Sequence, residues 1–198
     1  MRPVVIGIYG KSDAGKTSLL VQLIRKLTDE GCTVATIKKT DKKIGIDTKG
    51  KDTWKHSQAG ATVVVLSSPV ETDYLVKQKQ EINDIIGQLA LLGSYDVVLI
   101  EGARDPTIPK IRVGDIAERE NTIGTYEENF DEIVTMVRKK INEHTRSELE
   151  QNVSVKVNGN VVPLTAFPST FIKNIVVGML RSLKGVNDIN EVELRFKC

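Results

Sequence analysis

Short, almost wholly apolar runs alternate with amphipathic stretches along most of the chain. Residues 4–9, 33–37 and 96–102 form such runs, which are typical of strands buried on both faces of a sheet. After the first run, apolar residues recur with helical spacing from Leu19 to Leu27. A strand, a loop, a helix and a second strand in this order predict a βαβ unit, and therefore a parallel sheet.

The same pattern predicts further elements downstream. Helices are expected at residues 52–59, 81–93 and 130–143, and strands at residues 61–66, 108–113 and 122–125. Together these elements predict an α/β domain over residues 1–145, with a mostly parallel central sheet flanked by helices.

The pattern changes near residue 145. Residues 153–157 alternate between apolar and polar positions and lead into Asn158-Gly159, a two-residue hairpin signal. Helical spacing follows from Phe167 to Leu183, and residues 191–196 alternate again. We therefore expect a small α+β module of hairpin, helix and strand over residues 146–198. A core of this size is marginal alone, so we expect the module to pack on the first domain or on a partner chain.

Composition and charge exclude several functional classes. The net charge of the 198 residues is only +2, so no global excess of charge favours nucleic acid or an anionic membrane as a partner. No apolar run is long enough to span a membrane, and the N-terminus lacks the features of a secretory signal. The two cysteines, Cys32 and Cys198, show no metal-ligand spacing. The expected protein is cytoplasmic, with reduced thiols.

Residues 10–17, GKSDAGKT, match the phosphate-binding loop (P-loop) G-x-x-x-x-G-K-T. Gly10 and Gly15 permit backbone conformations that let successive N–H groups point inward, and the following helix adds its positive dipole end. Lys16 is expected to reach the β- and γ-phosphates, and the Thr17 hydroxyl to coordinate Mg²⁺. The predicted nucleotide contacts of the loop are Gly10, Lys11, Ser12, Asp13, Ala14, Gly15, Lys16, Thr17 and Ser18. The first domain is thus predicted to be a P-loop NTPase domain.

A second magnesium ligand is expected at the end of a buried strand. Glu101 closes the run 96–102, where open α/β sheets place their ligand sites. Asp96, at the opposite end of that run, is expected to be an exposed charge. The structural alternative for Glu101 is an ion pair with Arg104 or Lys110.

The polar segment 38–60 is long for a connection inside a domain, and such loops are often functional. Asp47 and Asp52 are candidates for metal binding or for positioning water, so we predict both as catalytic residues beside Lys16, and Asp47 also as a metal ligand. Lys51 is predicted to contact phosphate. The alternative is that this segment is only a solvated, charged surface.

Three blocks of the sequence resemble one known family. They are GKSDAGKTSLL at residues 10–20, TIKKTDKKIGIDTKGKDTWKHSQAGAT at 36–62 and DVVLIEGARDPTIPKI at 96–111. Their order and spacing are similar to those of molybdopterin-guanine dinucleotide biosynthesis protein B (MobB), and residues 153–198 are similar to an extension of some archaeal members.

The resemblance implies a dimeric P-loop protein that binds GTP and Mg²⁺ and hydrolyses GTP slowly, if at all. It implies an adapter for a MobA-type guanylyltransferase, the enzyme that joins GMP to molybdopterin. Molybdopterin would then be a second ligand, and molybdoenzyme or tungstoenzyme apoproteins further partners. By position, Gly10, Gly15, Lys16 and Thr17 match the phosphate loop of the family, Asp47 and Asp52 its switch-like segment, and Glu101 its second acidic motif. The helix expected at Phe167 to Leu183 is predicted to pack its apolar side chains on the small sheet of its own module. The alternative is that this module extends the dimer interface or docks MobA.

The sequence departs from the family after the second strand. Many members carry histidines there, whereas this chain has Lys38-Lys39-Thr40-Asp41. Lys38 is retained and is predicted to contact phosphate. Lys11 stands where some dimeric P-loop ATPases place a lysine that reaches the nucleotide of the neighbouring subunit, although the variable position of the motif also permits it by chance.

Other functional classes stay open at this stage. No N-K-x-D guanine-recognition motif occurs, so the preference for GTP rests on the resemblance. A dimeric ATPase or a small-molecule kinase is the alternative, with Arg104, Arg112 and Arg119 available for a lid. A pure interaction module is disfavoured because the Lys16-Thr17 pair is intact.

Overall fold

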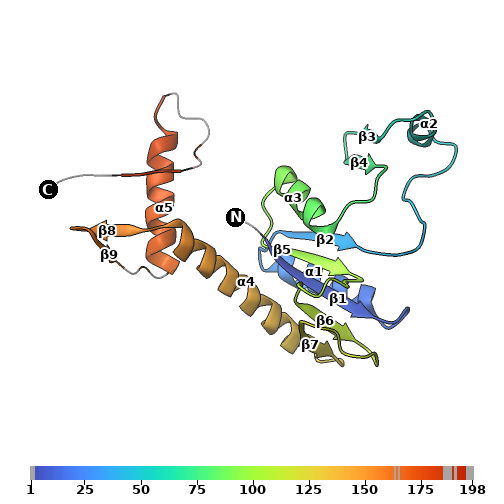
Figure 1. Cartoon of the computed structure of the whole chain (residues 1–198), viewed down its shortest axis with the longest axis horizontal. Coiled ribbons are helices and arrows are strands. Elements are labelled where there is room, and N and C mark those ends of the chain that lie inside the picture. The colour runs from blue at the N-terminus through green and yellow to red at the C-terminus, as the bar shows by residue number, and fades with distance from the viewer. Residues whose placement is uncertain (1–2, 163, 165, 185–188, 190, 195–198) are drawn as a thin grey trace. The chain divides into compact units, whose positions relative to one another are not determined.

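The computed structural model describes residues 3–162, 164, 166–184, 189 and 191–194 (Figure 1). The chain divides into two compact units, residues 2–130 and residues 131–198. None of the helices within the described residues is long and apolar enough to cross a membrane.

A five-stranded parallel sheet forms the centre of the first unit. Its strands, in spatial order, are β2 (Val34–Lys38), β5 (Val97–Glu101), β1 (Val4–Gly10), β6 (Lys110–Val113) and β7 (Thr122–Tyr126). All four neighbouring pairs are parallel. The predicted α/β fold with a mostly parallel sheet is therefore confirmed. The carboxyl ends of these strands share one edge, which brings together residues that are far apart in the sequence.

Helices α1 (Lys16–Asp29) and α3 (Ile82–Leu92) cover this sheet. Val98 and Ile100 of β5 belong to one buried cluster with Ile82 of α3. Strand side chains alternate between faces, so Val97 and Leu99, also fully buried, point to the opposite face. Burial on both faces explains why the strand is continuously apolar.

A separate antiparallel hairpin lies between β2 and α3 in the chain. It follows α2 (Asp52–Gln58) and consists of β3 (Val63–Ser67) and β4 (Thr72–Val76) (Figure 1). The predicted helix and first strand are confirmed, whereas β4 escaped prediction because its residues, TDYLV, form a short and partly polar run. Only Val64 of β3 is buried, so this strand is not part of a two-sided core.

The second unit contains α4 (Phe130–Asn152) from its second residue onward, and also β8 (Val155–Val157), β9 (Asn160–Val162) and α5 (Ala166–Arg181). The predicted hairpin and helix are confirmed, with Asn158 and Gly159 at positive φ angles of 52° and 85°. The strand predicted at residues 191–196 does not form over residues 191–194, and residues 195 and 196 lie outside the described residues. Val192 and Leu194 are exposed there, so apolar alternation alone misled the prediction. The predicted domain boundary at residue 145 falls within α4 and stays a prediction.

Candidate nucleotide-binding site

The P-loop connects the end of β1 to the first turn of α1. Asp13 and Gly15 adopt positive φ angles of 58° and 88°, which curl the backbone around the space before the helix. Gly15 is the N-cap residue, and no side chain caps the helix there. The N–H groups of the first turn are therefore available to an anion, and the helix dipole favours negative charge at this end.

Gly10 serves packing rather than backbone flexibility. It lies within β1, and a Cβ atom at this position would sit 2.4 Å from the carbonyl oxygen of Val113, its partner on β6. The expectation that Gly10 adopts an unusual backbone conformation is therefore wrong, because only Gly15 of the two has a positive φ angle. The two glycines of the loop thus meet different requirements, a steric one at Gly10 and a conformational one at Gly15.

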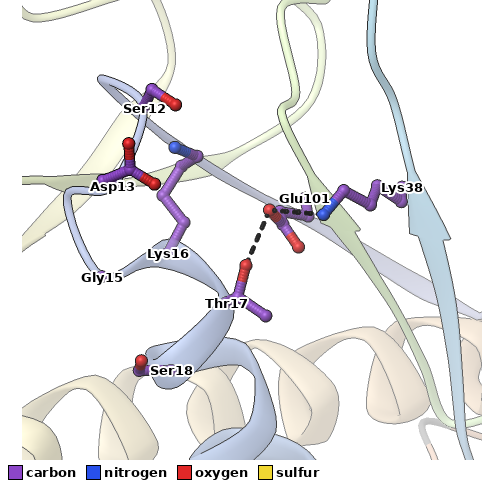
Figure 2. Close-up of a pocket in the computed structure, with 8 residues that line it drawn as sticks. All are labelled: Ser12, Asp13, Gly15, Lys16, Thr17, Ser18, Lys38 and Glu101. Atoms are coloured by element: carbon purple, nitrogen blue, oxygen red, sulfur yellow. Dashed lines mark hydrogen bonds and ion pairs between the residues drawn. The ribbon is translucent and has the colours of Figure 1, made fainter. Parts of the chain in front are cut away.

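Lys16 reaches back across the loop. Its Nζ donates a hydrogen bond to the backbone oxygen of Lys11, five residues earlier. Figure 2 shows the Lys16 side chain extending from the first turn of α1 toward Ser12 and Asp13. The ammonium group thus lies beside the curled backbone, where a phosphate group would need a positive charge.

Glu101 connects three elements at the carboxyl edge of the sheet. The Thr17 hydroxyl donates a hydrogen bond of 3.0 Å to Glu101 Oε1, and Lys38 Nζ lies 3.4 Å from the same oxygen (Figure 2). The register explains the second contact, because Lys38 and Glu101 are direct partners on β2 and β5. The Glu101 side chain is only 9% exposed, so its charge depends on these partners.

The alternative ion pairs proposed for Glu101 are not formed. Arg104 pairs with Asp41, and Lys110 Nζ donates a 2.7 Å hydrogen bond to the backbone oxygen of Glu120. Lys110 is fully buried, and burial lowers the pKa of its ammonium group. Asp96, expected to be an exposed charge, accepts hydrogen bonds from the backbone and hydroxyl of Thr33.

A pocket of about 380 Å³ lies between the loop and the ends of β2 and β5. This volume is within the range of small-molecule sites. Its lining residues are Ser12, Asp13, Gly15, Lys16, Thr17, Ser18, Lys38 and Glu101 (Figure 2). The predicted metal ligands Thr17 and Glu101 and the predicted phosphate contacts Lys16 and Lys38 are thus brought together.

The oxygen atoms of Thr17 and Glu101 suit magnesium. Mg²⁺ prefers hard oxygen ligands and usually takes one or two carboxylates, with water and phosphate oxygens completing the shell. No group of three or more His, Cys, Asp or Glu side chains able to hold a metal occurs in the part of the chain that the structure describes. A hydroxyl and a single carboxylate therefore fit a magnesium ion that arrives with a phosphate chain.

Asp47, Lys51 and Asp52 do not line this pocket. Asp47 accepts a 2.9 Å hydrogen bond from the Thr53 hydroxyl, and Lys77 Nζ lies 3.5 Å from its other oxygen. With its side chain 7% exposed, Asp47 has a structural role here, at the start of α2. Asp52 pairs with Lys55 on the surface. The catalytic and metal-binding roles assigned to these two aspartates stay predictions, as does phosphate contact by Lys51.

Tyr9 and Arg119 form a supporting network that the sequence analysis missed. The Arg119 backbone N–H donates to the Tyr9 hydroxyl at 2.9 Å, and the Arg119 guanidinium lies 4.8 Å from the centre of the Tyr9 ring. The same guanidinium donates to the Ala103 backbone oxygen at 3.0 Å. The strand that ends at the P-loop is thereby tied to the segment that follows Glu101. An aromatic residue in an otherwise aliphatic strand was the available signal.

Comparison with known proteins identifies the family. The family model described as Molybdopterin guanine dinucleotide synthesis protein B (MobB) matches residues 5–139. A protein of Methanocaldococcus jannaschii, provisionally named a molybdopterin-guanine dinucleotide biosynthesis adapter protein, is 25% identical, and the alignment covers 96% of each chain. A Haemophilus influenzae protein named molybdopterin-guanine dinucleotide biosynthesis adapter protein is 32% identical over 54% of this chain and 61% of its own.

Solved structures agree on the fold. Bacillus subtilis MobB superposes with a TM-score of 0.56 at 18% identity, covering 70% of this chain and 97% of its own. A second MobB crystal structure gives a TM-score of 0.52 at 23% identity, covering 70% and 99%. The resemblance seen in the three sequence blocks is confirmed, and the chain belongs to the MobB family.

Proposed function

We propose that this protein is a GTP-binding adapter that assists a MobA-type guanylyltransferase in attaching GMP to molybdopterin. The observation that carries this proposal is the pocket in which Lys16, Thr17, Lys38 and Glu101 converge on a P-loop. Two positive charges and the uncapped first turn of α1 suit a polyanionic ligand. The pocket alone indicates a nucleotide. Membership of the MobB family is the reason to propose GTP as that nucleotide and molybdopterin as the acceptor of GMP.

The residues that would hold magnesium are Thr17, through its hydroxyl, and Glu101, through its carboxylate. When bound, the ion would neutralise charge on the phosphate chain. Lys16 would hold the β- and γ-phosphates from the loop side. Asp47 remains a proposed additional ligand that would have to leave Lys77 and Thr53 to reach the ion.

We propose that the protein hydrolyses GTP slowly. Of the residues that line the pocket, only Asp13 and Glu101 carry carboxylates, and Glu101 is already engaged by Thr17 and Lys38. A rapid hydrolase positions a dedicated residue for the attacking water. An adapter needs binding rather than turnover, so the chemical step would belong to the partner enzyme in the cytoplasm. Molybdopterin and the molybdoenzyme or tungstoenzyme apoproteins would be met in the same complex.

A reconstituted transfer reaction tests the proposal. Purified MobA-type guanylyltransferase, molybdopterin and GTP are incubated with and without this protein, and formation of the guanine dinucleotide is followed. We expect the wild-type protein to increase the rate and Lys16→Ala to lose that increase, because the variant lacks the phosphate-binding ammonium group. An equal rate with and without the wild-type protein would refute the adapter role.

We further propose a homodimer formed through the β3–β4 hairpin. Val63 and Val65 lie on one face with Tyr74, the cross-strand partner of Val65, and these side chains are 51%, 49% and 57% exposed. Contiguous exposed apolar side chains on a hairpin favour burial against a partner. A second copy presents the same surface and would bury it symmetrically.

Val65→Asp is expected to convert the dimer to a monomer, because it places a charge in the centre of this apolar face. Light scattering coupled to gel filtration measures the mass in solution. Leu91→Asp is the matched control, since Leu91 is 86% exposed and belongs to α3 rather than to the hairpin. A Val65→Asp protein with the wild-type mass would contradict this interface.

A further inference from the structure

Lys38 occupies the position at Glu101 that a cation would take during nucleotide binding. Glu101 Oε1 accepts the Thr17 hydrogen bond at 3.0 Å and lies 3.4 Å from the Lys38 ammonium group. The hydroxyl and this carboxylate are the two side-chain groups that suit Mg²⁺ in the pocket. An ammonium ion and a magnesium ion would therefore compete for one carboxylate oxygen.

The surroundings of this ion pair allow such an exchange. The Glu101 side chain is only 9% exposed, so its charge needs a positive partner. The Lys38 side chain is 63% exposed, and its ammonium group stands at the end of a flexible aliphatic chain. Within the described residues, Glu101 is the only acidic group at ion-pair distance from Lys38. Once a divalent cation neutralises Glu101, no other acidic side chain in the described part of the chain would hold the Lys38 ammonium group by an ion pair.

The released Lys38 would face the phosphate chain. Lys38 lines the pocket together with Lys16, and Figure 2 shows the two side chains on opposite sides of the Glu101 carboxylate. Lys16 is expected to reach the β- and γ-phosphates, so a second ammonium group lining the same pocket would lie close to the terminal phosphate. A terminal phosphate carries the highest charge of a triphosphate and would attract a free ammonium group.

We propose that Lys38 is a specificity-determining residue that exchanges partners, from Glu101 in the nucleotide-free protein to the γ-phosphate when Mg²⁺ binds Glu101. The exchange rests on the proposed GTP binding and deepens it. It makes the site discriminate GTP from GDP, because only the triphosphate offers Lys38 a new partner. The diphosphate would leave Lys38 in competition with Mg²⁺ for Glu101.

The test compares GTP and GDP binding to wild type, Lys38→Met and the matched control Lys43→Met by calorimetry in Mg²⁺. Lys43 is an exposed lysine of the segment that follows β2, and it does not line the pocket. We expect Lys38→Met to lose about 10- to 100-fold in GTP affinity, as hydrogen bonds to charged groups imply. Its GDP affinity should be equal to that of wild type or higher, and Lys43→Met should behave as wild type.

Magnesium alone provides an independent measurement. Without the competing ammonium group, Mg²⁺ should raise the melting temperature of Lys38→Met more than that of wild type. Lys38→Gln gives the same comparison if the methionine variant folds poorly. An equal loss of GTP and GDP affinity, an unchanged ratio, or an equal magnesium effect in both proteins would overturn the exchange. Failure of the wild-type protein to bind either nucleotide would instead refute the proposed function itself.

Discussion

Lys16→Ala is expected to lower GTP affinity by at least about 100-fold while the protein stays folded. Lys16 is a half-buried side chain whose described contact is the hydrogen bond to the Lys11 backbone oxygen, so its removal costs the fold little. The lost ammonium group would have faced two phosphates of the nucleotide in a confined pocket, where each charge-assisted contact contributes about 1.5–3 kcal/mol. Calorimetry measures the affinity, and thermal unfolding followed by circular dichroism checks the fold.

Arg25→Ala provides the matched control for this experiment. Arg25 is an exposed basic residue on the same helix, outside the pocket, so its removal changes the net charge equally without touching the site. We expect its GTP affinity to equal that of wild type. If Lys16→Ala retained wild-type affinity, the P-loop would not be the nucleotide site.

Glu101→Gln is expected to remove the magnesium dependence of GTP binding and to lower affinity in Mg²⁺ about 10-fold or more. Glutamine keeps the shape of the side chain and an acceptor for the Thr17 hydroxyl, but it lacks the charge that a divalent ion requires. The loss corresponds to about 1.4 kcal/mol for each factor of ten. GTP titrations in Mg²⁺ and in excess chelator measure the effect.

Asp96→Asn is the matched control, which tests whether removing another carboxylate beside β5 also changes the magnesium dependence of GTP binding. Asp96 precedes β5 at the end opposite Glu101, where it binds Thr33. Its replacement is expected to affect stability but to leave the magnesium dependence of binding as in wild type. A Glu101→Gln protein with full magnesium dependence would exclude Glu101 as the metal ligand.

The parts of the site that could be predicted are those encoded by neighbouring residues. The P-loop is a continuous eight-residue pattern between an apolar strand and an amphipathic helix, so local sequence specifies its structure. Glu101 could be chosen because it ends a strand whose apolar character marks it as central. These features depend on periodicity and turn chemistry, which are visible in a single sequence.

The contact between Lys38 and Glu101 could not be predicted in the same way. It depends on β2 and β5 being adjacent and in a particular register, although 63 positions separate the two residues. The steric need for Gly10 likewise arises from β6, which begins a hundred residues later. Sequence patterns identify strands but not which strands become neighbours.

The contacts of the long loop between β2 and α2 could not be predicted from the sequence either. Asp47 contacts Lys77, thirty positions downstream, and a long irregular connection provides no periodicity from which that contact could be inferred. Lys77 follows the second strand of the β3–β4 hairpin, and the short turn that joins these two strands was not predicted from the sequence. Burial of Asp47 therefore became apparent only in the structure.

We propose above that this P-loop binds GTP with magnesium for use by a partner enzyme. The measurement that tests it most directly is calorimetric titration of the wild-type protein with GTP and, separately, with ATP, both in Mg²⁺. We expect saturable GTP binding at one site per chain and clearly weaker binding of ATP. A preference for ATP would contradict the proposed GTP-binding adapter and favour an ATPase or kinase. The absence of binding by either nucleotide would exclude a role in nucleotide binding.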